Sequence, residues 1–551
     1  MSMKSIIALF IICLLLPLTG LTKNNPDPTD RPEIVVGIVV DQMRYDFITR
    51  FWDLYEDDGI KRLYSEGFSF DNANYRYVPT YTAPGHTSIF AGTNPEVHGI
   101  IANNWFDKEA GEMIYCTDDE NVDPVGTESD AGRMSPHQML STTVTDELKL
   151  ATNHKSRTVG VALKDRSAIF PAGHNADGAY WFDPDSGDFV TSSWYHEQLP
   201  DWVEQFNQRD ILEEYLAEGW DLLLDESYYD ISREDDNPYE GPLPGGDKVT
   251  FPYDLEMKYE ETGPSLIQYV PQGNDITTDF AIAAIEGKEL GSGNATDFLA
   301  ISYSSPDYIG HRFGPQSREI QDQYLRFDQE IARLLDYLDN EFGEDEFLVF
   351  LTADHGVAHV PKYMQDLNIP AGYFYDDEVE EKLVEYSRYH FGTNLIRAFS
   401  NQQVFLDHER IDQENQDSEE VERKIATYLR KLEGVSGTLT AHDLNSTQFT
   451  EGIQARVQRG HHANRSGDIA AWLDPQWVPF WEDKTGTTHF SPYSYDTRVP
   501  LLWYGSGIEK GGSIRKVGIE DIAPTLGVLL GTAFPNGTTG EPLKELLDQR
   551  K

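Results

Sequence analysis

The sequence predicts an α/β protein in which helices sandwich a central, mostly parallel β-sheet and large insertions interrupt the core. Amphipathic helical patterns separate short apolar runs along the chain, as βαβ units require. The runs are rich in β-branched residues and apolar at consecutive positions, which is typical of strands buried on both faces of a parallel sheet. They are residues 33–40, 158–163, 297–303, 346–352 and 499–505.

The clearest helix is predicted over residues 317–342, where Ser317 is a candidate N-cap and Gly343 ends the pattern. Seven apolar side chains share one face of it: Ile320, Tyr324, Phe327, Ile331, Leu334, Leu335 and Leu338.

Two stretches interrupt the βαβ pattern. Residues 201–275 are acidic, aromatic and rich in Pro and Gly, as an elaborate loop or cap region would be, and residues 362–450 read as an α+β insertion with two amphipathic helices. We expect neither to be an independent domain. The chain is therefore predicted to form a single catalytic domain over 33–535, followed by a C-terminal tail at 536–551.

The first 22 residues are predicted to be a secretory signal peptide. Lys4 precedes an apolar run from Ile6 to Leu18, which is too short for a comfortable membrane span, and polar residues follow. An uncleaved anchor is the alternative. Cys13 lies in this segment, so Cys116 is left alone and no intrachain disulfide can form in the mature chain. We expect an exported bacterial protein, periplasmic or secreted, without a membrane span after cleavage.

The formal net charge of −50 excludes some partners. It disfavours binding of nucleic acid or anionic membranes through a broad basic surface, but it permits the binding of cations. Most of the carboxylates are expected to form a solvated surface. Calcium or magnesium in the acidic insertions stays an open question, and we expect a monomer.

Asp and His side chains, which commonly bind metal ions, follow three of the predicted strands. Asp41 follows the first run, Asp307 and His311 follow the third, and Asp354 and His355 follow the fourth. Ligands gather beyond the carboxyl ends of parallel strands, so these residues are predicted to converge, although a lone Asp after a strand is usually a helix N-cap.

Mixed Asp and His ligands suit zinc, or less tightly manganese or iron. Five such residues are too many for one catalytic zinc and instead suit a two-metal site for phosphoryl transfer. One more histidine is wanted, and spacing does not choose among His359, His461, His462 and His489.

The stretch "YVPTYTAPGHTSIFAGTNPEVHG", residues 77–99, is a candidate nucleophile segment. Pro84 suits the first turn of a helix, so Thr82 would lie near the helix N-terminus, where amide groups favour an alkoxide and a phosphate. From the residues alone, Thr80, Thr82, Thr87 and Ser88 all stay candidates.

Together with that stretch, "DQMRYDF", "SSPDYIGHRFGP", "LTADHG" and "TGTTHFSPYSYDTRVPLLWYG" resemble the alkaline phosphatase superfamily, in matching order over about residues 33–535. The resemblance is strongest to the PafA-type enzymes, exported bacterial monoesterases with a threonine nucleophile. It implies hydrolysis of small-molecule phosphate monoesters through a phosphothreonine at Thr82.

The same resemblance implies two zinc ions per chain. One would be held by Asp307, His311 and His489, and the other by Asp41, Asp354 and His355 together with the Thr82 oxygen. It also implies that Lys164 and Arg166 of "ALKDRS" and Asn103 of "GIIANNWFD" bind phosphate oxygens, although the neighbouring Asn104 could be confused with Asn103.

Three rival functions are weighed against a monoesterase. A phosphodiesterase or nucleotide pyrophosphatase of the same superfamily has a similar nucleophile segment but would want an apolar or nucleoside pocket near Lys164 and Arg166. A sulfatase would need Cys or Ser in C/S-x-P-x-R, where this chain has Thr82-Ala83-Pro84-Gly85-His86. The third rival belongs to another functional class. It is a non-catalytic exported binding protein in which the zinc site has only a structural role.

Overall fold

A computed structural model describes residues 31–209, 211–480 and 485–548 of the chain, so the predicted signal peptide lies outside it. Its centre is a ten-stranded sheet. In spatial order the strands are β20 (Gly511–Ser513), β2 (Phe68–Phe70), β19 (Leu501–Gly505), β11 (Phe347–Thr352), β1 (Ile34–Val40), β10 (Asp297–Tyr303), β7 (Thr158–Ala162), β8 (Gly178–Phe182), β9 (Phe189–Ser192) and β6 (Pro124–Val125).

The middle of the sheet is parallel. Strands β11, β1, β10, β7 and β8 pair in parallel with one another, and all their residues are buried. This confirms the predicted fold class and four of the predicted runs as parallel strands. The fifth run forms β19, which pairs antiparallel with β11. A continuous apolar run reports burial on both faces, and it carries no information on strand direction.

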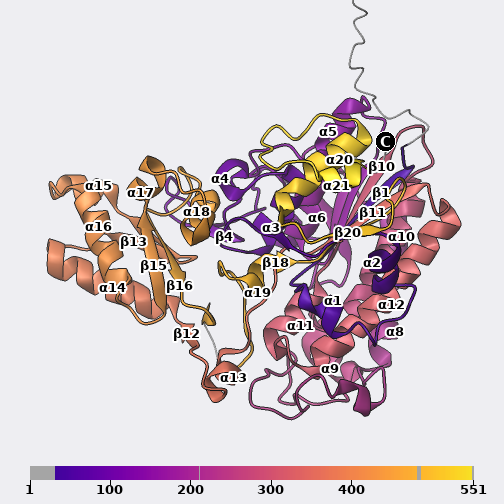
Figure 1. The fold of residues 1–551 in the computed structure, drawn as a ribbon, viewed down its shortest axis with the longest axis horizontal. Helices are drawn as coiled ribbons and strands as arrows, with labels where there is room; N and C mark the ends of the chain where they lie inside the picture. The colour runs from indigo at the N-terminus through magenta and orange to yellow at the C-terminus, as the bar shows by residue number, and fades with distance from the viewer. Residues whose placement is uncertain (1–30, 210, 481–484, 549–551) are drawn as a thin grey trace, which may run out of the picture.

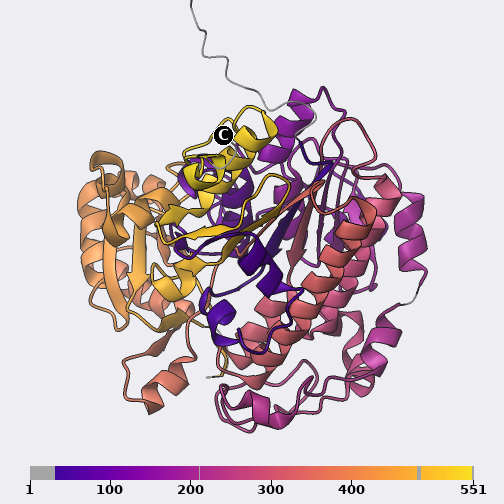
Figure 2. The same ribbon diagram turned by 45° about the vertical axis from the view of Figure 1, so that its right-hand side comes forward.

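Helices cover both faces of this sheet (Figures 1 and 2). On β10, the Phe298 ring contacts Phe90 of helix α3 (Thr82–Ala91) at 6.0 Å. Tyr303 contacts Phe327 of helix α12 (Arg318–Glu341) at 5.0 Å. The two strand residues are separated by an odd number of positions, so they point to opposite faces.

Further helices complete the two layers. Helix α6 (Asp165–Ala172) lies beside α3, and α10 (Gln272–Lys288) lies beside α12 (Figure 1).

Helix α12 follows its sequence pattern closely. It begins after Ser317, whose Oγ accepts a hydrogen bond from the Ile320 amide at 3.1 Å, and all seven predicted face residues are buried. The 201–275 stretch forms short helices, including α7 (Asp201–Asn207), α8 (Ile211–Ala217) and α9 (Leu255–Thr262). It docks on α12 through Asp322, which accepts hydrogen bonds from Trp220 Nε1 and the Leu223 amide.

The second insertion forms a separate lobe, drawn in orange on the left of Figure 1. Its four-stranded sheet has the order β13 (Ile396–Ser400), β14 (Gln403–Leu406), β16 (Ile469–Leu473) and β15 (Val435–Thr440). Both predicted helices occur, as α14 (Asp376–Phe391) and α16 (Ser418–Leu429), and they share an apolar core with the sheet. The lobe extends beyond residue 450, because β16 lies between β14 and β15.

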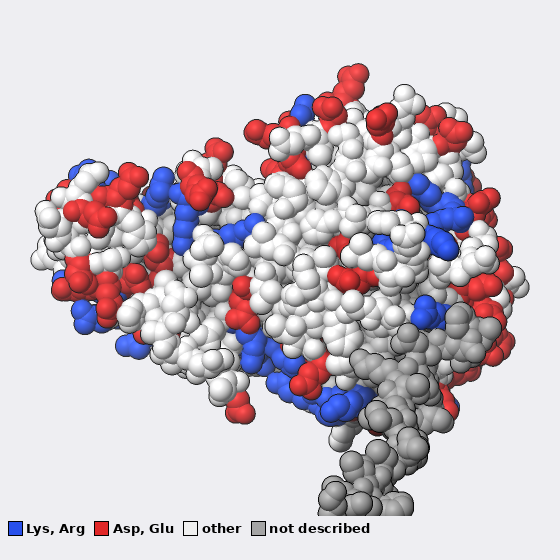
Figure 3. Space-filling view, turned by 90° about the horizontal axis from the view of Figure 1, so that it is seen from above, with Lys and Arg blue, Asp and Glu red and all other residues white. Residues whose placement is uncertain are grey.

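Charged side chains are spread unevenly over the surface. Seen from above, acidic side chains gather at both ends of the molecule, and basic side chains form smaller groups between them (Figure 3). Among the described residues, no helix is both long enough and apolar enough to span a membrane.

The segment expected to be a tail carries core residues. Leu543 and Leu546 are fully buried in the main apolar core, and the Leu543 amide donates to Thr525 Oγ1 at 2.8 Å on helix α20 (Ile522–Leu530). Residues up to the short helix α21 (Lys544–Leu547) therefore pack on the main apolar core.

We predict that Leu543→Ala lowers the free energy of unfolding by about 2–5 kcal/mol, the usual cost of emptying a packed leucine site. Leu150→Ala, at a position 53% exposed, is the matched control and should cost less than about 1 kcal/mol. Urea denaturation of both variants measures the difference. Equal, small effects would contradict the assignment of this segment to the core.

Candidate active site and metal centre

The candidate site lies at the carboxyl ends of four neighbouring parallel strands. Asp41 follows β1, and Asp307 and His311 lie on helix α11 (Ser305–Phe313), just after β10. Asp354 and His355 follow β11, and Lys164 follows β7 as the N-cap of α6. Since parallel strands end at the same edge, residues far apart in sequence meet there.

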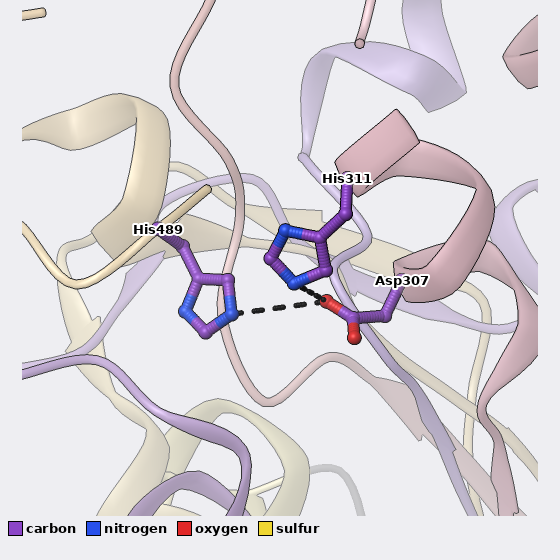
Figure 4. A group of neighbouring side chains, drawn as sticks. All are labelled: Asp307, His311 and His489. Carbon is purple, nitrogen blue, oxygen red and sulfur yellow. Dashed lines mark ion pairs between the residues drawn. The ribbon is translucent and has the colours of Figure 1, made fainter. Parts of the chain in front are cut away.

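One cluster of possible metal ligands consists of Asp307, His311 and His489 (Figure 4). His311 Nε2 lies 3.0 Å from Asp307 Oδ1, and His489 Nε2 lies 3.7 Å from the same oxygen. Asp307 and His311 are one helical turn apart, and His489 reaches them from a loop. That loop is held by Asp496, whose Oδ2 accepts from the Phe490 and Ser491 amides at 3.0 and 2.7 Å.

The other cluster is centred on His355. Its Nε2 lies 3.5 Å from Asp41 Oδ1 and 3.3 Å from Asp354 Oδ2. These three atoms are buried and have no hydrogen-bond partner among the described residues. Buried polar atoms are normally paired, so three unpartnered ligand atoms that face one another fit a metal ion. Asp307 borders this cluster as well as the first one. Ligand atoms of Asp41, Asp307 and His355 all lie within 4.8 Å of one another.

All three ligand-type histidines are oriented in the same way. Nδ1 of His311, His355 and His489 hydrogen-bonds a backbone carbonyl, that of Thr487 at 2.8 Å, Gly356 at 3.0 Å and Thr80 at 2.6 Å, respectively. A carbonyl only accepts, so each Nδ1 carries a proton and Nε2 is the ring atom that faces the site. This is the arrangement that metal-binding histidines adopt.

The site concentrates negative charge out of contact with water. Burial, and then the nearby Asp307, raise the pKa of Asp41 to about 6, and burial together with Asp41 raises the pKa of Asp354 well above its usual range. Burial acts in the same direction on Asp307, but His311 and Lys164 outweigh it and hold that pKa well below its usual value. The carboxylates therefore require cationic partners.

Lys164 is one such partner. Its Nζ donates to Asp41 Oδ2 and Asp307 Oδ2, both at 2.6 Å. Burial lowers the pKa of Lys164, but the charges of Asp307 and Asp41 outweigh that effect and raise the pKa above its usual value. The Lys164 side chain is therefore charged. Arg166 Nη1 donates to the Tyr115 hydroxyl at 2.7 Å, while its Nε is buried and has no hydrogen-bond partner among the described residues. Lys164 thus contacts a carboxylate of each cluster, and Arg166 is near enough for its charge to act on Asp41 and lower the pKa of that carboxyl.

Thr82 is the first residue of helix α3, as the position of Pro84 predicted. The adjacent amide of Ala83 donates to Asn103 Oδ1 at 2.9 Å, which fixes the Asn103 side chain beside this helix start. Thr87 Oγ1 donates to the Ala83 carbonyl at 2.7 Å, and Ser88 Oγ pairs with buried His98 at 3.0 Å. Thr82 is therefore better placed as the nucleophile than Thr87 or Ser88.

Several residues of the site were not identified from the sequence. The side-chain Nε2 of Gln42 donates to Asp307 Oδ1 at 2.6 Å, and its backbone N–H donates to Asp354 Oδ1 at 3.1 Å. Gln42 therefore joins the two clusters. His86 Nδ1 lies 2.9 Å from the Thr82 carbonyl and 3.5 Å from Asp354 Oδ2. Gln42 is adjacent to Asp41, and His86 is one helical turn after Thr82, so adjacency and helical spacing were the available signals.

The rival histidines belong to neither cluster. His359 Nδ1 pairs with Gln316, His461 Nε2 lies 3.3 Å from the Gly467 carbonyl, and the His462 amide donates to Ser466.

A cavity of about 540 Å³ opens onto the site. Asn103, His311 and His489 line its inner end, and residues of the insertion lobe line its outer end. Together these features are a threonine at a helix start, two clusters of possible metal ligands, two cationic side chains and a cavity.

Comparison with known proteins agrees with this geometry. The model of the type I phosphodiesterase / nucleotide pyrophosphatase family matches residues 35–495. The alkaline phosphatase PafA of Elizabethkingia meningoseptica is 42% identical over 96% of this chain and 96% of its own length. The chain belongs to the alkaline phosphatase superfamily.

Two other relatives extend this result. The crystal structure of wild-type alkaline phosphatase PafA superposes on this superfamily member with a TM-score of 0.90, 42% identity and coverage of 94% of this chain and 99% of that one. A Myroides odoratus protein called a calcium-transporting ATPase is also 42% identical, over 94% of this chain and 95% of its own.

We predict that His489→Ala releases the metal bound by Asp307 and His311, while the metal bound by the His355 cluster is retained. The reason is that His489 supplies a ligand atom to the first cluster and none to the second. Elemental analysis of purified protein should show about half the metal of the unmodified chain.

His461→Ala is the control and should leave the metal content unchanged, since His461 is outside both clusters. Loss of all metal from His489→Ala, or equal loss from both variants, would contradict two separable sites.

Proposed function

We propose that this protein is an exported phosphate monoester hydrolase that acts through a phosphothreonine at Thr82 and holds two zinc ions. The observation that carries the proposal is the position of Lys164 and Arg166 beside two ligand clusters and the start of helix α3. A monoester dianion has three non-bridging oxygens, and these cations supply charge-assisted donors for them.

The donor set favours zinc. Histidine Nε2 atoms and carboxylate oxygens are the ligands that zinc commonly takes in catalytic sites. Asp307, His311 and His489 would hold one ion, and Asp41, Asp354 and His355 the other. When bound, zinc supplies Lewis-acid polarisation of oxygens attached to phosphorus.

The chain's own residues account for the rest of the mechanism. The Thr82 oxygen attacks phosphorus and loses its proton to solvent, the bond from phosphorus to the leaving oxygen breaks, and that oxygen takes up a proton from solvent to leave as an alcohol. Water then attacks phosphorus, the bond to Thr82 breaks, a proton of the water restores the Thr82 hydroxyl by way of solvent, and inorganic phosphate leaves. Amides at the start of α3, together with Arg166, Lys164 and Asn103, stabilise the charge on the phosphoryl oxygens in both steps.

The family name keeps a phosphodiesterase as the second candidate. A diester replaces one non-bridging oxygen with a second ester group, so it uses fewer of the donors from Lys164, Arg166 and Asn103. The name of the Myroides relative is compatible with a monoesterase site, because the terminal phosphate of ATP is also a phosphoryl group with three non-bridging oxygens. A non-catalytic zinc-binding protein would bind metal but turn over no aryl phosphate.

Export, to the periplasm or the medium, rests on the apolar run near the N-terminus and on the PafA resemblance.

We predict that Thr82→Ala abolishes most phosphatase activity while the bound metal is retained. Thr82→Ser should keep part of the activity, because it keeps a hydroxyl at the same helix position. Acid-quenched turnover followed by mass spectrometry locates the phosphorylated residue. Phosphate trapped on Thr80, Thr87 or Ser88 would overturn the assignment.

We predict that Lys164→Ala and Arg166→Ala each lower kcat/KM for an aryl phosphate monoester by about 30- to 1000-fold, as loss of one desolvated charged donor does. The matched aryl diester should lose much less, since it presents fewer non-bridging oxygens. Both substrates are measured with the unmodified chain and both variants.

Lys424→Ala, on the solvent-facing side of helix α16, is the surface control and should change neither activity. Parallel losses on both substrates would mean that Lys164 and Arg166 only position the site, and a preference of the unmodified chain for the diester would favour the second candidate.

A further inference from the structure

The outer end of the active-site cavity is formed by the insertion lobe. The first turn of helix α14 contributes Asp376, Asp377 and Glu378, and the aromatic side chains of Tyr375 and Phe480 lie beside them. The inner end is formed by the site itself. One continuous space therefore joins Asn103, a predicted phosphate contact, and the cluster of His311 and His489 to an acidic and aromatic wall on another lobe.

Tyr81 connects the two ends of this cavity. It directly precedes Thr82, its ring lies 5.8 Å from the ring of His489, and it lines the same space as Asp376. A leaving group bound against Tyr81 would therefore lie in the same space as the carboxyl groups of the wall.

The wall carries uncompensated negative charge. Asp376 is partly buried and accepts a hydrogen bond from Gln402 Nε2 at 3.1 Å, and burial with the nearby Asp377 raises its pKa to about 7. Glu378 pairs with Lys382 at 3.3 Å, whereas neither Asp376 nor Asp377 forms an ion pair within the described part of the chain. Asp377, together with Asp376 in its ionised form, exceeds the roughly half unit of positive charge at a helix N-terminus.

We propose that this wall selects phosphate monoesters whose leaving group carries a positive charge, such as esters of amino alcohols. The proposal rests on the proposed monoesterase function and names its substrate class. The phosphate dianion would meet Lys164 and Arg166, while the ammonium group would meet carboxylates and aromatic faces at the other end of the cavity. The bound substrate would thus be aligned by opposite charges at its two ends.

The test compares two substrates of the same shape, phosphocholine and its uncharged analogue in which carbon replaces the quaternary nitrogen. Their alcohols differ as leaving groups, so the ratio of their kcat/KM values in the unmodified chain does not decide the question. The change in that ratio on mutation does decide it. Asp376→Asn, Asp377→Asn and Glu378→Gln remove charge from the wall and keep its shape.

We expect each substitution to lower the ratio by about 2- to 5-fold, as loss of one partly exposed charge contact does, and the triple variant to lower it by about 10-fold or more. The uncharged ester should be affected little. Glu381→Gln, an exposed position on the same helix that does not line the cavity, is the matched control and should leave the ratio unchanged. Asp377 is exposed, so its variant is expected to fold even if the triple variant does not.

An unchanged ratio in Asp377→Asn and Asp376→Asn would overturn the proposal, and would instead favour a hydroxyl-rich leaving group bound by the amide side chains of the cavity. An equal change in Glu381→Gln would also overturn it, because the effect would then arise from the overall charge of the lobe. Failure of the unmodified chain to hydrolyse the uncharged ester would count against the monoesterase function itself, and the two failures are therefore distinguishable.

Discussion

The structure depends on one electrostatic constraint, the burial of three carboxylates at the edge of the sheet. Strand β1 lies between β10 and β11, so Asp41 is brought against Asp307 and Asp354 where water is excluded. Like charges in such surroundings are costly unless cations accompany them. Lys164 supplies one cation, and the unpartnered atoms around His355 fit a metal that would supply another.

Close backbone packing positions the helix that carries Thr82, the predicted nucleophile. Helix α3 lies directly against the loop that follows β11, since a Cβ at Gly85 would be 2.6 Å from the Asp354 carbonyl oxygen. Only glycine allows this approach, and it brings the helix start, with Thr82, to the metal clusters. Gly310 plays a similar part, because a Cβ there would meet Gln42, which joins Asp307 to Asp354.

Much of this arrangement could be predicted from the sequence, for identifiable reasons. Buried parallel strands are apolar at consecutive positions, so β1, β10 and β11 and the acidic residues after them stood out. The direction of β19 and the contacts of Gln42 with Asp307 and Asp354 could not be predicted, because antiparallel pairing and contacts between distant residues leave no local pattern. For Gln42 the only local signal was its place next to Asp41. His489 came from family resemblance alone, since its loop is shaped by Asp496 and not by a regular element.

The two lobes divide the work of the site. The parallel sheet holds every predicted metal ligand except His489 and Thr82, together with Lys164 and Arg166, at or just after strand ends that packing on both faces keeps rigid. The cavity wall opposite comes from α14, whose lobe has its own apolar core. Substitutions on that lobe can therefore alter which leaving group is accepted without disturbing the buried charges. The buried carboxylates at the strand ends determine the chemistry of the site, and the cavity wall formed by α14, which does not contact them, determines the selectivity for the leaving group.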